Sequence, residues 1–242
     1  MYNSLMTSST SQSIEKKLKE TNTRIGQAAQ QYGRSSSDIQ LLAVSKTQPA
    51  ESLRIAYSLG QSAFGENYLQ EAIDKIEALK DCQITWHFIG GIQSNKTKTI
   101  AENFDWVHSV DRLKIARRLS DARPSYLPPL NICLQINVSN EDSKSGINLT
   151  ELTDLANQAS LLPNIKLRGL MTLPAASNDF DEQRANFAAI AKAFQQLKQE
   201  GLDVDTLSMG MSNDLEAAIA EGATIVRIGS AIFGPRPQIK KP

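Results

Sequence analysis

Residues 41–46 read Leu-Leu-Ala-Val-Ser-Lys, an apolar run of interior character that ends on a lysine. Seven more short apolar runs follow it, at residues 63–67, 85–90, 106–111, 131–137, 167–173, 206–211 and 224–229. Stretches of helical character lie between these runs, for example at residues 70–79, 113–119, 149–161, 184–197 and 214–221. Continuously apolar strands that alternate with helices are typical of a parallel sheet covered by helices. Eight such units predict an α/β fold, a single (β/α)8 TIM barrel.

An open α/β sheet is the alternative interpretation of the same pattern. Its nucleotide-binding versions are disfavoured, because the chain has no Gly-x-Gly-x-x-Gly after the first strand and no Gly-x-x-x-x-Gly-Lys. Residues 1–12 are polar, and we interpret them as a flexible N-terminal tail. A helix at residues 13–32 then precedes the first strand. No linker or low-complexity segment interrupts the rest, so residues 13–242 are predicted to form one domain.

The composition excludes several classes of protein. Lys plus Arg and Asp plus Glu both total 26, so no net charge attracts nucleic acid or an acidic membrane. The two cysteines, Cys82 and Cys133, lie far apart, which indicates a reducing compartment and argues against a disulfide framework or a metal site. No secretory signal and no apolar stretch of roughly 20 residues is present, so we expect a cytoplasmic protein.

Functional residues of a (β/α)8 barrel lie at the C-terminal ends of its strands, and phosphate often binds after strands seven and eight. After the seventh run, Ser212 can cap a helix at residues 214–221, and the N-terminal end of a helix favours an anion. After the eighth, Gly229 permits close approach of the backbone to a ligand, and Ser230 offers a hydroxyl and an amide. These positions predict a phosphate site.

A lysine at the end of the first strand places a primary amine at the same end of the barrel as the predicted phosphate site. A ligand with a phosphate at one end and an aldehyde at the other fits both features, and pyridoxal 5'-phosphate has this form. Lys46 would hold it as a Schiff base, which requires a neutral amine with a lowered pKa. Arg227 would place a permanent cation near the ring or the phosphate.

The sequence motifs resemble those of the pyridoxal phosphate homeostasis proteins, often called the YggS or PROSC family. The resemblance covers residues 41–234. Its motifs are Val-Ser-Lys-Thr (44–47), Phe-Gly-Glu-Asn-Tyr-Leu-Gln-Glu (64–71), His-Phe-Ile-Gly (87–90), Gln-Ser-Asn-Lys (93–96), Gln-Ile-Asn-Val (135–138), Ser-Lys-Ser-Gly (143–146), Arg-Gly-Leu-Met (168–171), Leu-Ser-Met-Gly-Met-Ser (207–212) and Val-Arg-Ile-Gly-Ser-Ala-Ile-Phe-Gly (226–234).

This resemblance implies a barrel similar to the N-terminal domain of alanine racemase, the fold type III barrel that binds pyridoxal phosphate. It places the cofactor on the lysine that ends the first strand, Lys46. It also implies that Arg227 faces the pyridine nitrogen. The other cofactor-binding positions that it implies are Ser212, Gly229 and Ser230 for the phosphate and Asn67, Met171 and Ser208 for the lining.

The same resemblance favours a carrier over an enzyme. Alanine racemase-like enzymes take one acid-base group from a tyrosine in a C-terminal β domain, whereas this chain ends at Pro242, shortly after the last strand. An arginine at the pyridine nitrogen also weakens the ring as an electron sink. We therefore expect a monomeric, non-catalytic protein of vitamin B6 homeostasis that buffers pyridoxal phosphate or delivers it to apo-enzymes. A low-efficiency amino-acid racemase and a sugar-phosphate isomerase are the alternatives.

Three further residues have weaker functional interpretations. His87 and His108 lie on predicted strands without a partner at ligand spacing, so we expect packed, hydrogen-bonded histidines. Lys144, in a polar loop, is expected to be a surface residue that could compete for the aldehyde or pass the cofactor on.

Overall fold

The computed structural model describes residues 2–138 and 145–235, and its central feature is a closed barrel of eight parallel strands in sequence order. Each strand pairs with the next, and β8 pairs with β1 to close the ring. The prediction of a (β/α)8 barrel is confirmed, and each of the eight apolar runs overlaps a strand. The strands are β1 (Gln40–Val44), β2 (Ala63–Glu66), β3 (Thr85–Phe88), β4 (Trp106–Val110), β5 (Leu130–Ile136), β6 (Ile165–Thr172), β7 (Thr206–Ser208) and β8 (Ile225–Ile228).

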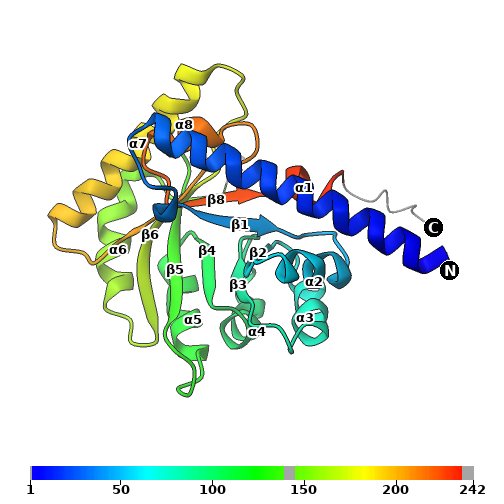
Figure 1. Cartoon of the computed structure of the whole chain (residues 1–242). Helices are drawn as coiled ribbons and strands as arrows, with labels where there is room; N and C mark the ends of the chain where they lie inside the picture. Colours follow the sequence, from blue (N-terminus) through cyan, green and yellow to red (C-terminus); the bar gives the residue numbers. More distant parts are fainter. Residues whose placement is uncertain (1, 139–144, 236–242) are drawn as a thin grey trace.

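Helices surround the barrel on the outside (Figure 1). They are α1 (Tyr2–Gln31), α2 (Ala50–Ser58), α3 (Leu69–Ala78), α4 (Thr97–Asn103), α5 (Leu113–Ala122), α6 (Leu152–Ser160), α7 (Phe180–Gln199), α8 (Leu215–Ala220) and α9 (Ser230–Phe233). Short 3-10 helices span Ser36–Asp38, Ser94–Lys96 and Leu149–Glu151. Helix α1 runs across the barrel beside β1 and β8, and it contacts α2, α8 and α9.

The N-terminal helix is longer than the sequence pattern indicated. It begins at Tyr2 and therefore includes residues that we assigned to a flexible tail. The serine- and threonine-rich stretch has low helix propensity, but it contains no proline or glycine that would end a helix. Over residues 10–31 of this helix, the buried residues, such as Ile14, Leu18 and Ile25, lie in the part for which the sequence predicted a helix.

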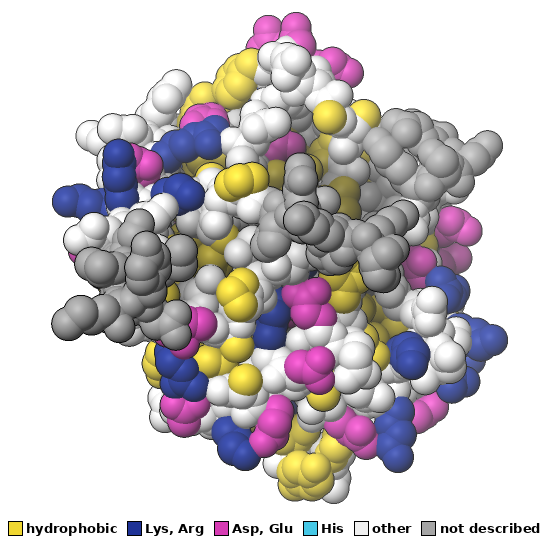
Figure 2. Space-filling model, turned by 90° about the vertical axis from the view of Figure 1, so that its right-hand side faces the viewer, with side chains coloured by type: hydrophobic (Ala, Val, Ile, Leu, Met, Phe, Trp, Pro, Cys, Tyr) yellow, Lys and Arg dark blue, Asp and Glu magenta, His cyan; other side chains and the backbone are white. Residues whose placement is uncertain are grey.

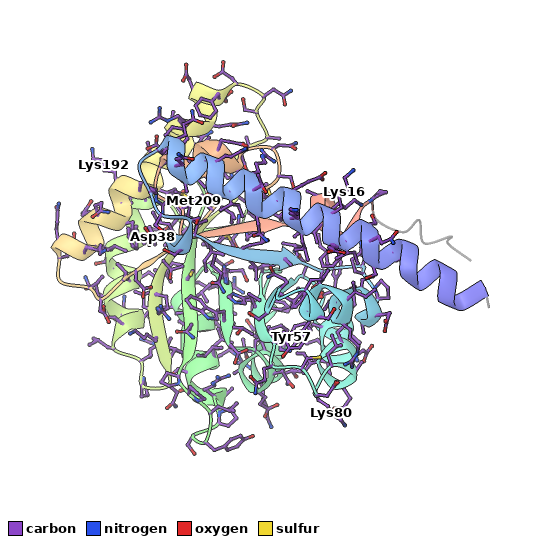
Figure 3. All side chains as sticks on the ribbon, in the orientation of Figure 1. Lys16, Asp38, Tyr57, Lys80, Lys192 and Met209 are labelled. Atoms are coloured by element: carbon purple, nitrogen blue, oxygen red, sulfur yellow. The ribbon has the colours of Figure 1, made fainter. Side chains whose placement is uncertain are left out.

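The strands bury residues on two sides, as expected for a barrel inside a layer of helices. Leu41 and Ala43 of β1 belong to the large apolar cluster that also contains residues of the helices. The residue between them, Leu42, belongs to a separate small cluster with Ala63 and Ile225. Because successive side chains of a strand point to opposite faces, this alternation separates the outer core from the barrel interior. In Figure 3, the labelled Lys16, Lys80 and Lys192 lie outside both clusters and point outward from the molecule.

Two classes of site find no support in the parts of the chain that the structure describes. Within residues 2–138 and 145–235, no group of three or more His, Cys, Asp or Glu side chains is arranged to hold a metal ion. Over the same residues, no helix combines the length and apolar character that a bilayer span requires. Both cysteines are free thiols.

One glycine is required by a register shift between β5 and β6. The pairing changes between Ile132 and Cys133, and Gly169 on β6 has a φ of 152° at this point. A Cβ atom on Gly169 would lie 1.9 Å from the carbonyl oxygen of Thr206 on β7. Both the backbone conformation and the packing therefore exclude a side chain here.

Substitution Gly169→Ala should destabilise the barrel, because it forces β6 and β7 apart and strains the backbone. We expect the free energy of unfolding to fall by about 2–4 kcal/mol. Urea denaturation followed by circular dichroism measures the change. Gly91→Ala is the matched control, since a Cβ atom there meets no atom within 4 Å, and a loss of similar size in both variants would contradict this account.

Candidate cofactor site

A cavity of about 370 Å³ opens at the C-terminal ends of the strands. The face towards which β1 points in Figure 1 is seen directly in Figure 2, where positive and negative side chains are intermixed and no histidine is visible. Residues from the ends of β1, β2, β6 and β8 and from the segment after β7 meet in this cavity. The predicted site residues that line it are Lys46, Asn67, Met171, Ser212, Arg227, Gly229 and Ser230.

Lys46 reaches the cavity because β1 continues past its last paired residue. The N–H of Ser45 still donates to the carbonyl of Gly65 at 3.0 Å, which extends the pairing of β1 with β2. Lys46 comes next and is half-buried at the wall of the cavity. The chain then turns through Thr47, whose φ of 64° is rare for a β-branched residue. Lys46 therefore lies between the end of β1 and this sharp turn.

Arg227 supplies a buried positive charge to the same cavity. Its Nη1 donates to the carbonyl of Ser208 at 2.5 Å and to the Ser208 hydroxyl at 2.8 Å, and its Nη2 donates to the carbonyl of Thr172 at 2.8 Å. Burial lowers the pKa of Arg227 to about 10, so the guanidinium stays protonated at neutral pH. Within the described residues, no carboxylate forms a salt bridge with it. The cavity can therefore accommodate an electron-rich group beside this cation.

The segment after β8 adds backbone donors. Helix α9 begins at Ser230, and the first N–H groups of a helix have no partner inside it. Gly229 precedes the helix, and a Cβ atom there would lie 3.1 Å from the carbonyl oxygen of Val44. Gly229 thus brings β8 close to the end of β1, a structural reason for the glycine in addition to the one expected from the sequence.

The interpretation of Ser212 as a helix cap is wrong. Helix α8 begins at Leu215, and its N-cap position is Asp214, whose Oδ1 accepts from the N–H of Met211 at 2.5 Å. Ser212 lies in the turn before this helix, and its carbonyl accepts from Arg24 of α1 at 2.6 Å. The N-cap position lies two residues after Ser212, so the helix begins beyond the reach of the Ser212 side chain. Ser212 still lines the cavity.

Ser208 lies below the cavity rather than in its wall. It is fully buried, and its hydroxyl connects Arg227 to His108 Nδ1, which lies 2.8 Å away. The other nitrogen of His108 lies 2.9 Å from Nδ1 of His87, so that a hydrogen-bonded chain runs through the barrel interior. The expectation of packed, hydrogen-bonded histidines is confirmed. The sequence did not show that the two histidines meet, because they lie on different strands.

The hydrogen-bond pattern assigns the protons along this chain. Arg227 has only donors, so the Ser208 hydroxyl accepts from it, and the arrangement that gives the hydroxyl proton an acceptor has it donate to His108 Nδ1. Nε2 of His108 then carries a proton and donates to His87 Nδ1. Burial lowers the pKa of His87 to about 3, and burial lowers that of His108 well below its usual value. Both histidine rings are therefore neutral, and Arg227 is the charged group of this hydrogen-bonded series.

The groups around the cavity fit pyridoxal phosphate. Lys46 offers an amine for an aldehyde, Arg227 a cation for an electron-rich ring atom, and the start of α9 backbone N–H groups for a phosphate. Asn67 adds a buried side-chain oxygen, Oδ1, that has no hydrogen-bond partner in the structure. An unpartnered buried polar atom in a cavity indicates a group that completes it when bound.

Comparison with known proteins agrees with this geometry. Residues 22–237 match the family described as alanine racemase, N-terminal domain. A pyridoxal phosphate homeostasis protein of Pseudomonas aeruginosa is 56% identical over 92% of this chain and 96% of its own length. A protein of the same name from Escherichia coli is 51% identical over 94% of this chain and 99% of its own. This chain belongs to the pyridoxal phosphate homeostasis protein family.

Solved structures place this family member among similar barrels. The protein PipY of Synechococcus elongatus, with pyridoxal phosphate bound, is 36% identical and superposes with a TM-score of 0.80 over 91% of this chain and 100% of its own. Alanine racemase of Corynebacterium glutamicum superposes with a TM-score of 0.67 at 20% identity, over 96% of this chain and 63% of the racemase. The second comparison shows a common fold only.

Several residues at or beside the cavity of this chain were not predicted from its sequence. Gln48 and Ile89 also line the cavity. Glu66 and Lys75 form a buried ion pair beside the turn that carries Lys46. A carboxylate at the end of an apolar strand was the available signal for Glu66. Lys144, proposed as a second amine, lies outside the described residues.

The neutral histidines predict a pH-dependent stability. A histidine with a lowered pKa in the folded state stabilises the fold fully above the unfolded pKa of about 6.5 and loses that contribution as pH falls towards the folded pKa. Lowering the pH from about 7.5 to 5.5 should cost about 1.4 kcal/mol for each of His87 and His108.

Urea denaturation at both pH values, compared between the wild type and His87→Gln, measures this effect. The glutamine oxygen can still accept from His108 but does not titrate. The loss of stability between the two pH values should therefore be smaller in the variant by about 1.4 kcal/mol. Equal losses in both proteins would show that His87 is not held neutral by the barrel.

Proposed function

We propose that this chain binds pyridoxal 5'-phosphate as a Schiff base on Lys46 and serves in vitamin B6 homeostasis as a cofactor carrier. The observation that carries the proposal is the convergence of Lys46, Arg227 and the start of α9 on one cavity. The names of the homologues, and the pyridoxal phosphate bound to PipY, support it. When bound, the cofactor supplies an aldehyde that condenses with an amine, with loss of water.

The residues of the cavity have distinct roles in this proposal. Ser230, Gly229 and Ser212 bind the phosphate through backbone N–H groups and hydroxyls. Arg227 faces the pyridine nitrogen and, having only donors, keeps that nitrogen unprotonated. Asn67 and Met171 line the ring. Ser208 acts from below by orienting the Arg227 guanidinium.

The same arginine favours a carrier over an efficient enzyme. A pyridine nitrogen that stays unprotonated is a poor electron sink, so the ring stabilises negative charge on a bound amino acid weakly. The relatives' shared name describes homeostasis and not a reaction. We infer a non-catalytic protein that acts in the cytoplasm as a monomer and that buffers the cofactor or passes it to apo-enzymes.

Replacing Lys46 should abolish the covalent complex. On addition of pyridoxal phosphate, the wild type should gain a visible absorption band, and borohydride should fix the cofactor to Lys46, as peptide mass spectrometry can show. Lys46→Ala should give neither signal. Lys80→Ala, on an outward-pointing lysine, is the control and should behave as the wild type (Figure 3). A wild type without the band would refute the cofactor assignment.

A low-efficiency amino-acid racemase is the second candidate, because the chain matches the alanine racemase N-terminal domain. Incubation of the loaded protein with separate L- and D-amino acids, followed by chiral chromatography, distinguishes the two functions. A carrier should convert them no faster than free pyridoxal phosphate does. Faster conversion that Lys46→Ala removes would establish an enzyme instead.

A further inference from the structure

A network of charged side chains lies buried beside the turn that carries Lys46. Lys75 of α3 is at its centre and donates to Glu66 Oε1 at 2.7 Å and to Glu71 Oε1 at 2.5 Å. The side chain of Glu66 is completely buried and that of Lys75 is 6% exposed, whereas that of Glu71 is 30% exposed. We call Glu66, Lys75 and Glu71 the charged triad.

The charged triad contacts the backbone on both sides of Lys46. Lys75 donates to the carbonyl oxygen of Ser45 at 2.7 Å, and Glu66 accepts from the Ser45 hydroxyl at 2.6 Å. Glu71 accepts from the N–H of Thr47 at 2.6 Å. The residue before Lys46 and the residue after it are thus tied to the same network.

The residue that Glu71 holds is in an unfavourable conformation. Thr47, with φ of 64°, is the one residue other than glycine with positive φ within residues 2–138 and 145–235. A β-branched residue in this region is strained, and such strain persists only where the surrounding structure enforces it. Its hydroxyl is buried without a partner, so the threonine side chain does not stabilise the turn. The N–H of Gln48 donates to the Ser45 carbonyl at 3.0 Å and closes the turn, and the hydrogen bond from the Thr47 N–H to Glu71 at 2.6 Å is the side-chain contact that holds the strained residue itself.

We propose that the charged triad positions Lys46 by holding the strained turn at Thr47, so that the amine faces the cavity and meets the aldehyde. This inference rests on the proposed function for its purpose, and it adds three positioning residues that do not line the cavity. Stability alone is a weak reason for such a network, because desolvation of a buried ion pair offsets much of its attraction. Contacts with the residues on both sides of Lys46 give the network a specific role.

The first test measures the turn without any cofactor. In hydrogen exchange followed by mass spectrometry, Glu71→Ala should speed the exchange of the Thr47 amide by about tenfold or more, because that N–H loses its acceptor. Glu77→Ala is the matched control: Glu77 lies on the same helix, pairs with Lys80 and is 72% exposed, and its loss should leave the turn unchanged. Unchanged exchange in Glu71→Ala would overturn the inference.

The second test measures the reaction of Lys46 with pyridoxal phosphate by stopped-flow absorbance. Glu71→Ala should slow formation of the visible band by about 10- to 100-fold, because a displaced reacting group loses its productive geometry. Glu71→Gln retains an oxygen that can accept from Thr47, so it should stay within about threefold of the wild type. An unchanged rate in Glu71→Ala would overturn the inference.

A second-site rescue separates positioning from general damage. Asparagine tolerates positive φ better than threonine does, so Thr47→Asn in the Glu71→Ala background should restore most of the lost rate. Urea denaturation of the same variants shows whether the recovered rate merely follows recovered stability. Failure of the rescue would overturn the inference while the wild-type band still supports the proposed function. A wild type that gains no band would refute the proposed function. The hydrogen-exchange experiment would still test whether Glu71 holds the turn at Thr47.

Discussion

Closure of the sheet between β1 and β8 is the constraint on which the site depends. Residues 40–43 pair in parallel with residues 225–228, although more than 180 positions separate them in the sequence. Because both strands run in the same direction, their C-terminal ends emerge at one mouth. Lys46 follows the first strand, and Gly229 and Ser230 follow the last. An open sheet would place these two strands differently and would leave the amine and the proposed phosphate-binding positions apart.

The barrel interior shows how one buried cation is accommodated. Arg227 has no salt bridge among the described residues, and it is instead hydrogen-bonded to two carbonyls and to Ser208. Behind it, His108 and His87 continue the chain as neutral rings, and His87 stacks on Trp106. A charged histidine next to the guanidinium would add repulsion in a region of low dielectric. This hydrogen-bonded series of side chains therefore has its one positive charge, on Arg227, at the cavity, where an electron-rich ligand atom can approach.

The likeness to alanine racemase illustrates how one barrel serves different purposes. The two proteins share the fold at 20% identity, and fold alone does not determine function. In this chain, Lys46 and Arg227 line one cavity, and in the proposed function the arginine would face the ring and weaken the chemistry that a racemase needs. The proposed role of the charged triad is to position the Lys46 amine for binding. These features together suit a protein whose task is to hold a reactive aldehyde.

The sequence by itself determined the eight strands, their order and the positions at their ends. Apolar runs and helical spacing are local properties, so they could be read without knowledge of distant contacts. The motifs also led to seven residues that line the cavity, Lys46 among them. Tertiary structure alone decided what surrounds them: Ser208 lies beneath the cavity, Ser212 does not cap α8, and His87 meets His108. It also decided the strained turn at Thr47, because a conformation that local preference opposes is stabilised only by partners such as Glu71, brought there by the fold.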